Sequence, residues 1–329
     1  MTDFSFGTSM TVMRRTAPFI LFRMVVYFGI AVAYVVVTGT GAGIGWTVGL
    51  AGTDDFQASS TVWGGAIGLG ATAAVLYFLR EYILYMVKAG HIAVMVEYLE
   101  GKDLPEGRSQ IAHAQAVVKE RFGAANTLFA LDQIVKGVLK VVVGIIQGIA
   151  NFLPIPGLDG AVKLIRAFLK TAVGLLDEVI LGHLIRTRAE NPWSGGRDAL
   201  VLYAQNAKPM LMNAAWIALA SWILSFVVFL LMLAPAALVV WLIPGSWSAG
   251  GFIFAIIFAW AVKAALIEPF AIACLLQAYF KVTDGQTPNP EWTAKLDGAS
   301  KKFKEMGQKA ASWATGGRVG GARPEAPAP

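Results

Sequence analysis

The stretch that decides the fold runs from Met210 to Ile243 and reads MLMNAAWIALASWILSFVVFLLMLAPAALVVWLI. It contains no Asp, Glu, Lys or Arg. Residues 244–248 interrupt it with Pro-Gly-Ser-Trp-Ser, and Gly251–Phe280 is apolar again except for Lys263 and Glu268. A helix of about 20 apolar residues spans the hydrocarbon core of a bilayer, and soluble domains do not need a helix that is apolar on every face for this long. The stretch therefore predicts an integral membrane protein.

The composition of the whole chain agrees with that class. Of its 329 residues, 56% are hydrophobic and 15% are charged, and the formal net charge is +6. No long basic patch interleaves with aromatic residues, so we expect contact with membrane lipids and no nucleic-acid partner. The single cysteine, Cys274, lies in an apolar run, which argues against a disulfide framework or a thiolate metal cluster.

Hydropathy along the chain predicts an all-α polytopic membrane protein with about six transmembrane helices. The apolar run after Arg14 and Arg15 lacks a small-residue cleavage site, so we interpret it as a membrane helix and not as a signal peptide. The expected spans are 18–38, 62–79 with a helical extension to 99, 126–152, 161–185, 210–243 and 251–280. The expected polar ends are the N-terminus, 1–17, an amphipathic surface helix within 281–314, and a disordered tail, 315–329.

The loop charges predict the orientation in the membrane. Nearly all loop Lys and Arg lie before residue 18, in 80–121, in 186–208 and in the C-terminal tail. The loops 39–60 and 244–250 and the turn 153–160 contain none. Six spans place the basic loops on one face, and the positive-inside rule makes that face cytoplasmic. Both termini are then expected in the cytoplasm, in a multi-pass protein of a bacterial inner membrane.

The two middle spans would form a charged helical hairpin. Residues four apart on a helix lie one above another, which aligns Asp132, Lys136 and Lys140 on one face of the first arm. Charges in hydrocarbon are costly, so such faces must meet each other, water or head groups. The candidate polar pathway comprises Asp132, Lys136, Lys140, Lys170, Asp177 and Glu178. Two self-neutralising stripes, or a hairpin lying at the membrane interface, remain as alternatives.

Glu268 is the leading candidate for a substrate-binding residue. It lies inside the last expected span and precedes Pro269, which frees a backbone carbonyl one turn earlier. An intramembrane carboxylate is a functional candidate by default. The structural alternative is an ion pair with Lys263 or with a lysine of the hairpin.

Three tryptophans complete the predicted substrate site. Trp216, Trp222 and Trp260 lie deeper in the last two spans than an interfacial aromatic belt would. Their rings could enclose a quaternary ammonium group through cation–π contacts, or they could simply pack. Arg23, near the start of the first span, is expected to extend toward the head groups.

The sequence contains no motif that supports an enzyme activity. Residues 151–160 contain Asp159-Gly160, like the second metal motif of site-2 intramembrane metalloproteases, but none of His91, His113 and His183 is followed by Glu. A zinc hydrolase needs three ligands and a general base. Gly39–Gly45 lacks the Lys-Ser/Thr of a P-loop. We therefore expect no catalytic residue, no metal site and no cofactor.

From about Arg80 onward the layout resembles the C-terminal membrane core of choline transporter-like proteins. The most specific match is Arg197-Asp198-Ala199-Leu200 with Asn206 eight residues beyond Asp198, just before a long span. Two long spans follow, the second with an intramembrane acid at Glu268, and Thr283-Asp284-Gly285 then precedes a charged helix. The chain departs from the family in lacking its large extracellular domain and several early spans. The resemblance implies a membrane transporter fold with choline as the family's substrate.

Two functions follow as hypotheses. The first is passive or ion-coupled translocation of a small cationic or zwitterionic solute, choline-like or lipid-derived. The second is a non-transporting membrane subunit or scaffold whose buried charges hold helices or a partner together. A small organic cation, a second copy of the chain or another membrane protein would be the partner in these cases.

Overall fold

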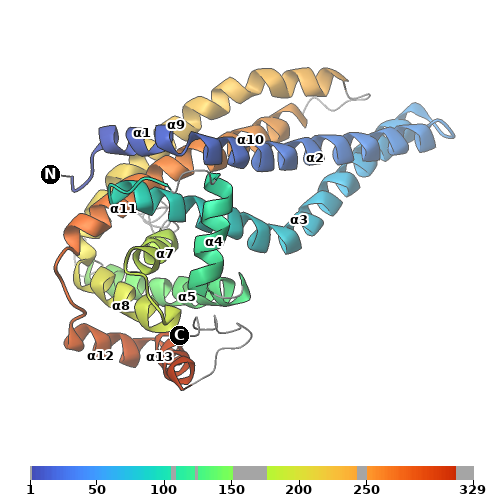
Figure 1. The fold of residues 1–329 in the computed structure, drawn as a ribbon. Coiled ribbons are helices and arrows are strands. Elements are labelled where there is room, and N and C mark those ends of the chain that lie inside the picture. Colours follow the sequence, from blue (N-terminus) through green and yellow to red (C-terminus); the bar gives the residue numbers. More distant parts are fainter. Residues whose placement is uncertain (1, 105–108, 123–124, 151–175, 243–249, 316–329) are drawn as a thin grey trace, which may run out of the picture. The chain divides into compact units, whose positions relative to one another are not determined.

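The computed structural model describes residues 2–104, 109–122, 125–150, 176–242 and 250–315. Within these ranges the protein consists of helices and connecting turns, with no β-strand (Figure 1). In chain order the elements are α1 (Phe6–Arg15), α2 (Ala17–Gly49), α3 (Asp54–Leu99), α4 (Gln110–Phe122), α5 (Ala125–Ala150), α7 (Leu176–Arg186), α8 (Pro192–Gln205), α9 (Ala207–Leu242), α10 (Gly250–Val262), the π-helix η1 (Lys263–Ile267), α11 (Glu268–Val282), α12 (Pro290–Ala299) and α13 (Lys301–Ala314). The predicted all-α class is confirmed for this part of the chain.

Four helical segments are long and apolar enough to cross a membrane. They are Ala17–Gly49, Asp54–Leu76, Ala207–Leu242 and Gly251–Val282. They coincide with four of the six spans expected from the sequence, and 6% of the most apolar window of Ala207–Leu242 is buried. Apolar side chains exposed over such a length fit contact with lipid rather than with water. The four helices therefore fit a multi-pass membrane protein.

The predicted charged hairpin is described only in part. Its first arm, expected over 126–152, is α5. Of its second arm, expected over 161–185, the structure describes the end, which is α7; residues 151–175 lie outside the described ranges, as does the tail 316–329. Among the described elements α5 packs against α4, α7, α8 and α13.

The chain divides into two compact units. The polar unit comprises Met1–Thr16, Lys88–Leu219 and Ala271–Pro329, and the apolar unit comprises Ala17–Val87 and Ala220–Phe270. The core of the polar unit contains three helix segments whose residues are buried on every face, namely 89–96 of α3, 199–204 of α8 and 271–276 of α11. A helix enclosed on all sides needs no polar face, which explains why these segments consist mainly of apolar residues, with His91 as a buried polar exception.

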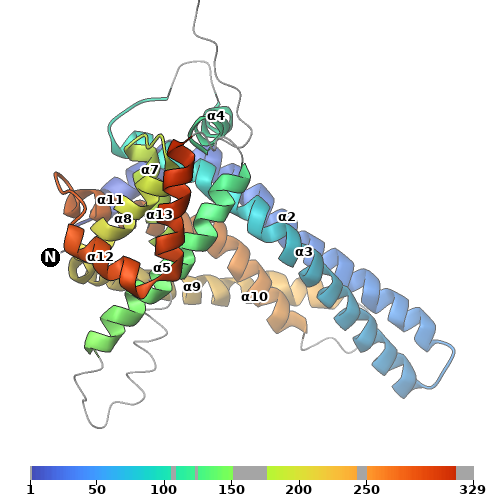
Figure 2. The same cartoon turned by 90° about the horizontal axis from the view of Figure 1, so that it is seen from below.

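The surface helix predicted after residue 281 is two helices, α12 and α13, which belong to the polar unit and pack against its helix α8. Ser300 ends α12 and caps α13, because its hydroxyl accepts a hydrogen bond from the backbone N–H of Phe303. Arg197 of α8 contacts both helices: its guanidinium donates to both carboxylate oxygens of Asp297, at 3.1 and 2.9 Å, and lies over the Phe303 ring. Figure 2 shows α12 and α13 beside α8 and α5.

In the apolar unit, glycines bring the backbones of α2 and α3 into contact. A Cβ atom on Gly45 would lie 2.0 Å from the Ser60 carbonyl oxygen, and one on Gly64 would lie 2.1 Å from the Gly41 carbonyl oxygen. Small residues at four-residue spacing permit such close approach of membrane helices. The segment 39–60, expected as a loop, is therefore helical except for a short turn between Gly49 and Asp54.

The buried stripe of α2 leads to the candidate site. Phe19, Arg23, Tyr27 and Ala31 are all buried, and they follow one another at intervals of four residues on one face of the helix. This face packs on α10 and η1 within the apolar unit. Arg23 is the one charged residue in the stripe.

Candidate functional site

The helix around Glu268 changes its hydrogen-bond register just before that residue. Lys263–Ile267 is π-helical, and the backbone N–H of Glu268 donates to the carbonyl of Lys263, five residues earlier. In this register the carbonyl of Ala264 would accept from residue 269, but Pro269 has no N–H. The π-helix and the proline together leave the Ala264 carbonyl oxygen without a helical donor. Short π-helical segments of this kind occur frequently at functional sites.

Arg23 supplies the missing donor. Its Nη2 donates to the Ala264 carbonyl oxygen at 2.5 Å and lies 3.8 Å from the Glu268 carboxylate. The Arg23 side chain is fully buried, whereas that of Glu268 is 19% exposed. The prediction that Arg23 extends toward the head groups is therefore wrong, because an orphaned carbonyl and a carboxylate hold its guanidinium inside the apolar unit.

Two aromatic rings extend this pair into a cluster. The Arg23 guanidinium carbon lies 5.4 Å from the centre of the Tyr27 ring, within cation–π range. Tyr27 in turn meets Trp260 edge-to-face, with 5.5 Å between the ring centres. Glu268 and Trp260, two of the four predicted substrate-binding residues, therefore belong to one cluster, connected through Arg23 and Tyr27.

The other two predicted tryptophans lie on the surface of α9. Trp216 is 56% exposed and Trp222 is 38% exposed. Rings with this exposure are available to lipid or to another helix. Of the three tryptophans predicted to enclose an ammonium group, Trp260 belongs to the cluster, where its ring contacts that of Tyr27.

The charges of the predicted polar pathway form ion pairs in the polar unit. Lys136 Nζ lies 2.6 Å from the Asp132 carboxylate, one turn away on α5. Lys88 of α3, outside the predicted set, donates from Nζ to Glu178 at 2.9 Å. Lys140 is exposed, and Lys170 and the side chain of Asp177 lie outside what the structure describes. The Asp132–Lys136 pair fits the self-neutralising interpretation of the hairpin, whereas Glu178 is neutralised by a lysine from α3.

His183 adds a pH-sensitive contact to the polar unit. Its Nδ1 lies 3.2 Å from the Tyr279 hydroxyl. Burial lowers the pKa of His183 from 6.5 to about 4, and the neighbouring Arg186 contributes in the same direction. The folded protein therefore keeps this imidazole neutral at pH values where the unfolded chain binds a proton.

This difference predicts a loss of stability in mild acid. The unfolded chain binds the extra proton below pH 6.5, so stability is complete above that pH and falls until the pH reaches about 4. Between pH 7 and pH 5 the free energy of unfolding should fall by about 2 kcal/mol more in the wild type than in His183→Gln. Thermal unfolding of both proteins in detergent at the two pH values measures this difference. Equal losses would contradict the role given to His183.

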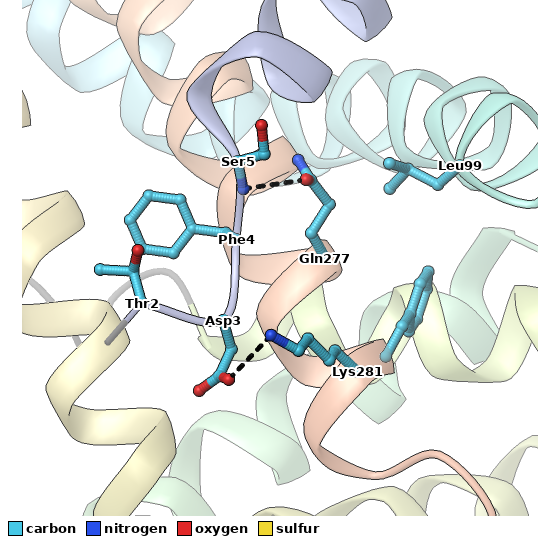
Figure 3. Close-up of a pocket in the computed structure, with 8 residues that line it drawn as sticks. Thr2, Asp3, Phe4, Ser5, Leu99, Gln277 and Lys281 are labelled. Carbon is cyan, nitrogen blue, oxygen red and sulfur yellow. Dashed lines mark hydrogen bonds and ion pairs between the residues drawn. The ribbon is translucent and has the colours of Figure 1, made fainter.

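A second feature of the polar unit is a cavity of about 400 Å³ near the N-terminus (Figure 3). Residues 2–5 form one wall, and Leu99, Gln277, Phe280 and Lys281 form the rest. Lys281 Nζ lies 3.3 Å from the Asp3 carboxylate, and the Ser5 backbone N–H donates to the Gln277 side-chain oxygen. A hydrogen bond from Asn213 lowers the pKa of Asp3, so this carboxylate is charged at neutral pH. These contacts fasten the N-terminal segment to α9 and α11.

Sequence reasoning missed Arg23 and Tyr27 as members of the site. The available signal was an arginine within an apolar run, four residues before a tyrosine and four after a phenylalanine, which is the spacing of one helix face.

Among the described residues no group of three or more His, Cys, Asp or Glu side chains could hold a metal ion.

Comparisons with models of protein families, with curated proteins and with solved structures find no match to this chain. The resemblance to choline transporter-like proteins therefore stays a prediction from short motifs. A functional conclusion must come from the chemistry of the Arg23–Glu268 cluster.

Proposed function

We propose that the protein is a multi-pass membrane protein of the transporter type, and that it binds a small solute carrying an ammonium group at Glu268. The observation that carries this proposal is the partly exposed Glu268 carboxylate in an apolar helix, next to a π-helix and a fully buried arginine. Ionisable groups in membrane helices are rare and commonly mark substrate or ion pathways. Helices broken near the bilayer centre provide binding groups in many transporters.

The electrostatics favour an ammonium group as the ligand of the carboxylate. Two unit charges 4 Å apart interact by about 4 kcal/mol at an effective dielectric constant of 20, before desolvation costs. An aromatic ring adds about 2 kcal/mol when the contact is desolvated, and Trp260 is the predicted tryptophan that contacts Tyr27 in this cluster. The carboxylate is therefore the dominant contact.

We further propose that, within the part of the chain that the structure describes, four segments cross the membrane. The first half of α5 contacts helices of the two basic segments that follow it, 186–208 and the C-terminal part of the chain: Lys302 of α13 donates to the Gln133 carbonyl, and Gly196 of α8 faces Leu131. Residues 138–150 of α5 are then too few to span a bilayer, which takes about 20 residues. Four spans keep all basic loops on one face, and the positive-inside rule makes that face, with both termini, cytoplasmic. The charge distribution suits a bacterial inner membrane.

A binding screen with a charge-removing variant tests the site. Purified protein in nanodiscs is titrated calorimetrically with choline, ethanolamine, glycine betaine and spermidine. At least one compound should bind to the wild type, and Glu268→Gln should weaken that binding by about tenfold or more, because it removes a charge–charge attraction of about 4 kcal/mol at contact before desolvation costs. Trp260→Phe should weaken it less.

Two further variants control for misfolding and for general effects of charge. Glu305→Gln removes the same charge from an exposed position on α13 and should leave binding unchanged. Glu268→Asp keeps the charge beside Arg23 but withdraws the carboxylate by one methylene, so it should fold and still bind weakly. A folded Glu268→Gln protein with wild-type affinity would refute Glu268 as the binding group.

The second candidate function is a non-transporting membrane subunit. The hydrogen bond from Arg23 to the Ala264 carbonyl favours it, because this contact repairs a helix defect whether or not a solute binds. On this hypothesis no compound of the screen binds, and Glu268→Gln lowers stability without changing any affinity. The exposed tryptophans of α9 would then face a partner helix or lipid.

A further inference from the structure

The Arg23 guanidinium has hydrogen-bonding capacity that the described structure does not use. Nη2 donates to Ala264, but Nε and Nη1 have no acceptor within hydrogen-bond distance among the described residues. The side chain is fully buried. An ionised donor removed from water without a partner is costly, so these N–H groups require an acceptor that the described residues do not provide.

The neighbours of Arg23 limit what that acceptor can be. Glu268 approaches Nη2, the nitrogen that already donates to Ala264. On the Tyr27 side the guanidinium meets a ring face, which attracts a cation but does not replace hydrogen bonds to Nε and Nη1. An acceptor for these nitrogens should carry negative charge, because guanidinium binds carboxylate and phosphate groups most strongly.

The same arrangement argues against a solute that is only a cation. Arg23 lies 3.8 Å from the carboxylate and offsets its charge, so an ammonium group approaching Glu268 also meets the repulsion of a buried guanidinium. A solute with its own anionic group cancels that repulsion by binding Arg23. A solute entering from the surface would meet the partly exposed Glu268 carboxylate first, and the buried guanidinium of Arg23 lies next to that carboxylate.

We infer that Arg23 is the anion-binding half of the site and that the solute is a small zwitterion, with its carboxylate or phosphate on Nε and Nη1 of Arg23 and its ammonium on Glu268. This inference rests on the proposed function, in which Glu268 holds the ammonium group. It adds that the protein discriminates against cations that lack an anionic group. A free metabolite and the head group of a zwitterionic lipid offer the same chemistry.

Matched ligand pairs test the discrimination. Protein in nanodiscs of phosphatidylglycerol, which contain no zwitterionic lipid, is titrated with glycine betaine and its methyl ester, β-alanine and its methyl ester, and glycerophosphoethanolamine and ethanolamine. The two members of each pair share the ammonium group and differ in the anionic group. One zwitterion should bind about tenfold or more tightly than its partner, as expected for a charge-assisted hydrogen bond. The pair that shows the difference distinguishes a free carboxylate from a lipid phosphate.

Variants of Arg23 assign the discrimination to this residue. In Arg23→Gln the zwitterion should bind no more tightly than the compound of its pair that lacks the anionic group. Arg14→Gln removes an exposed arginine and should change the affinity of neither compound. Arg23→Lys keeps the positive charge if the glutamine variant does not fold, and it should lose most of the preference because lysine lacks the planar set of donors.

The outcomes separate the two proposals. Equal affinity of both members of every pair, with binding that still depends on Glu268, would overturn the zwitterion inference and leave the proposed function standing. Full discrimination in Arg23→Lys and Arg23→Gln would also overturn it. If no compound of either kind binds, both proposals fail. If sodium chloride displaces the zwitterion at concentrations close to the dissociation constant of the zwitterion itself, Arg23 binds a simple anion, and the inference is refuted.

Discussion

Gly45→Ala is expected to destabilise the protein strongly, although it adds a single methyl group. The new Cβ would lie 2.0 Å from the Ser60 carbonyl oxygen and 3.0 Å from the Thr61 Cα, both backbone atoms that cannot rotate away. The helices α2 and α3 must then separate, and overpacking of this kind costs about 3 kcal/mol. Thermal unfolding in detergent, followed by size-exclusion chromatography, measures the loss.

Gly43→Ala provides a matched control with the opposite sign. A Cβ on Gly43 meets nothing within 4 Å, and the residue lies in the same helix two positions earlier. Alanine is the better helix former by about 0.5–1 kcal/mol, so this variant should be slightly more stable than the wild type. Equal behaviour of the two variants would contradict the close packing of α2 on α3.

Arg23→Met is expected to have the second large effect on stability. It removes the donor to the Ala264 carbonyl and leaves the Glu268 carboxylate without the guanidinium at 3.8 Å. Breaking a buried ion pair by removing one partner costs about 3–5 kcal/mol, and the partial exposure of Glu268 places the expected value near the lower end.

A double-mutant cycle isolates the interaction between the two charges. Replacing both residues, in Arg23→Met with Glu268→Leu, should cost less than the sum of the single changes, because neither charge then remains buried alone. The expected coupling is about 1–3 kcal/mol, measured by chemical unfolding in detergent. Strict additivity would show that the 3.8 Å approach carries no energy and that the contact with Ala264 is the whole role of Arg23.

The two stability effects and the binding proposals rest on different contacts. The glycine pair lies near the turn between α2 and α3, and the ion pair lies at the junction of η1 and α11. A variant such as Gly43→Ala should therefore leave ligand affinity unchanged. The polar unit contributes the His183 contact, whose titration is independent of both.

The sequence by itself determined the class of the protein. The uncharged run Met210–Ile243 and the apolar residues around Lys263 and Glu268 sufficed, because hydropathy is a local property that each helix carries without its neighbours. The same reasoning located Glu268 as an unusual charge beside a proline. It also predicted the helical extension to residue 99, and α3 indeed continues without a break to Leu99.

Only the tertiary structure decided what surrounds Glu268. The hydrogen bond that defines the site joins Arg23 to Ala264, 241 positions apart, and no periodic pattern specifies such a pair. The π-helix η1 packs against α2 and lies just before Pro269, and the exposure of Trp216 and Trp222 depends on which face of α9 is covered. Gly41 and Gly45 lie in the segment 39–60, which the sequence predicted as a loop; contact between two backbones makes them, together with Gly64, part of a helix pair. Side-chain chemistry along the chain fixes which segments are apolar, whereas the pairing of distant groups is fixed by packing.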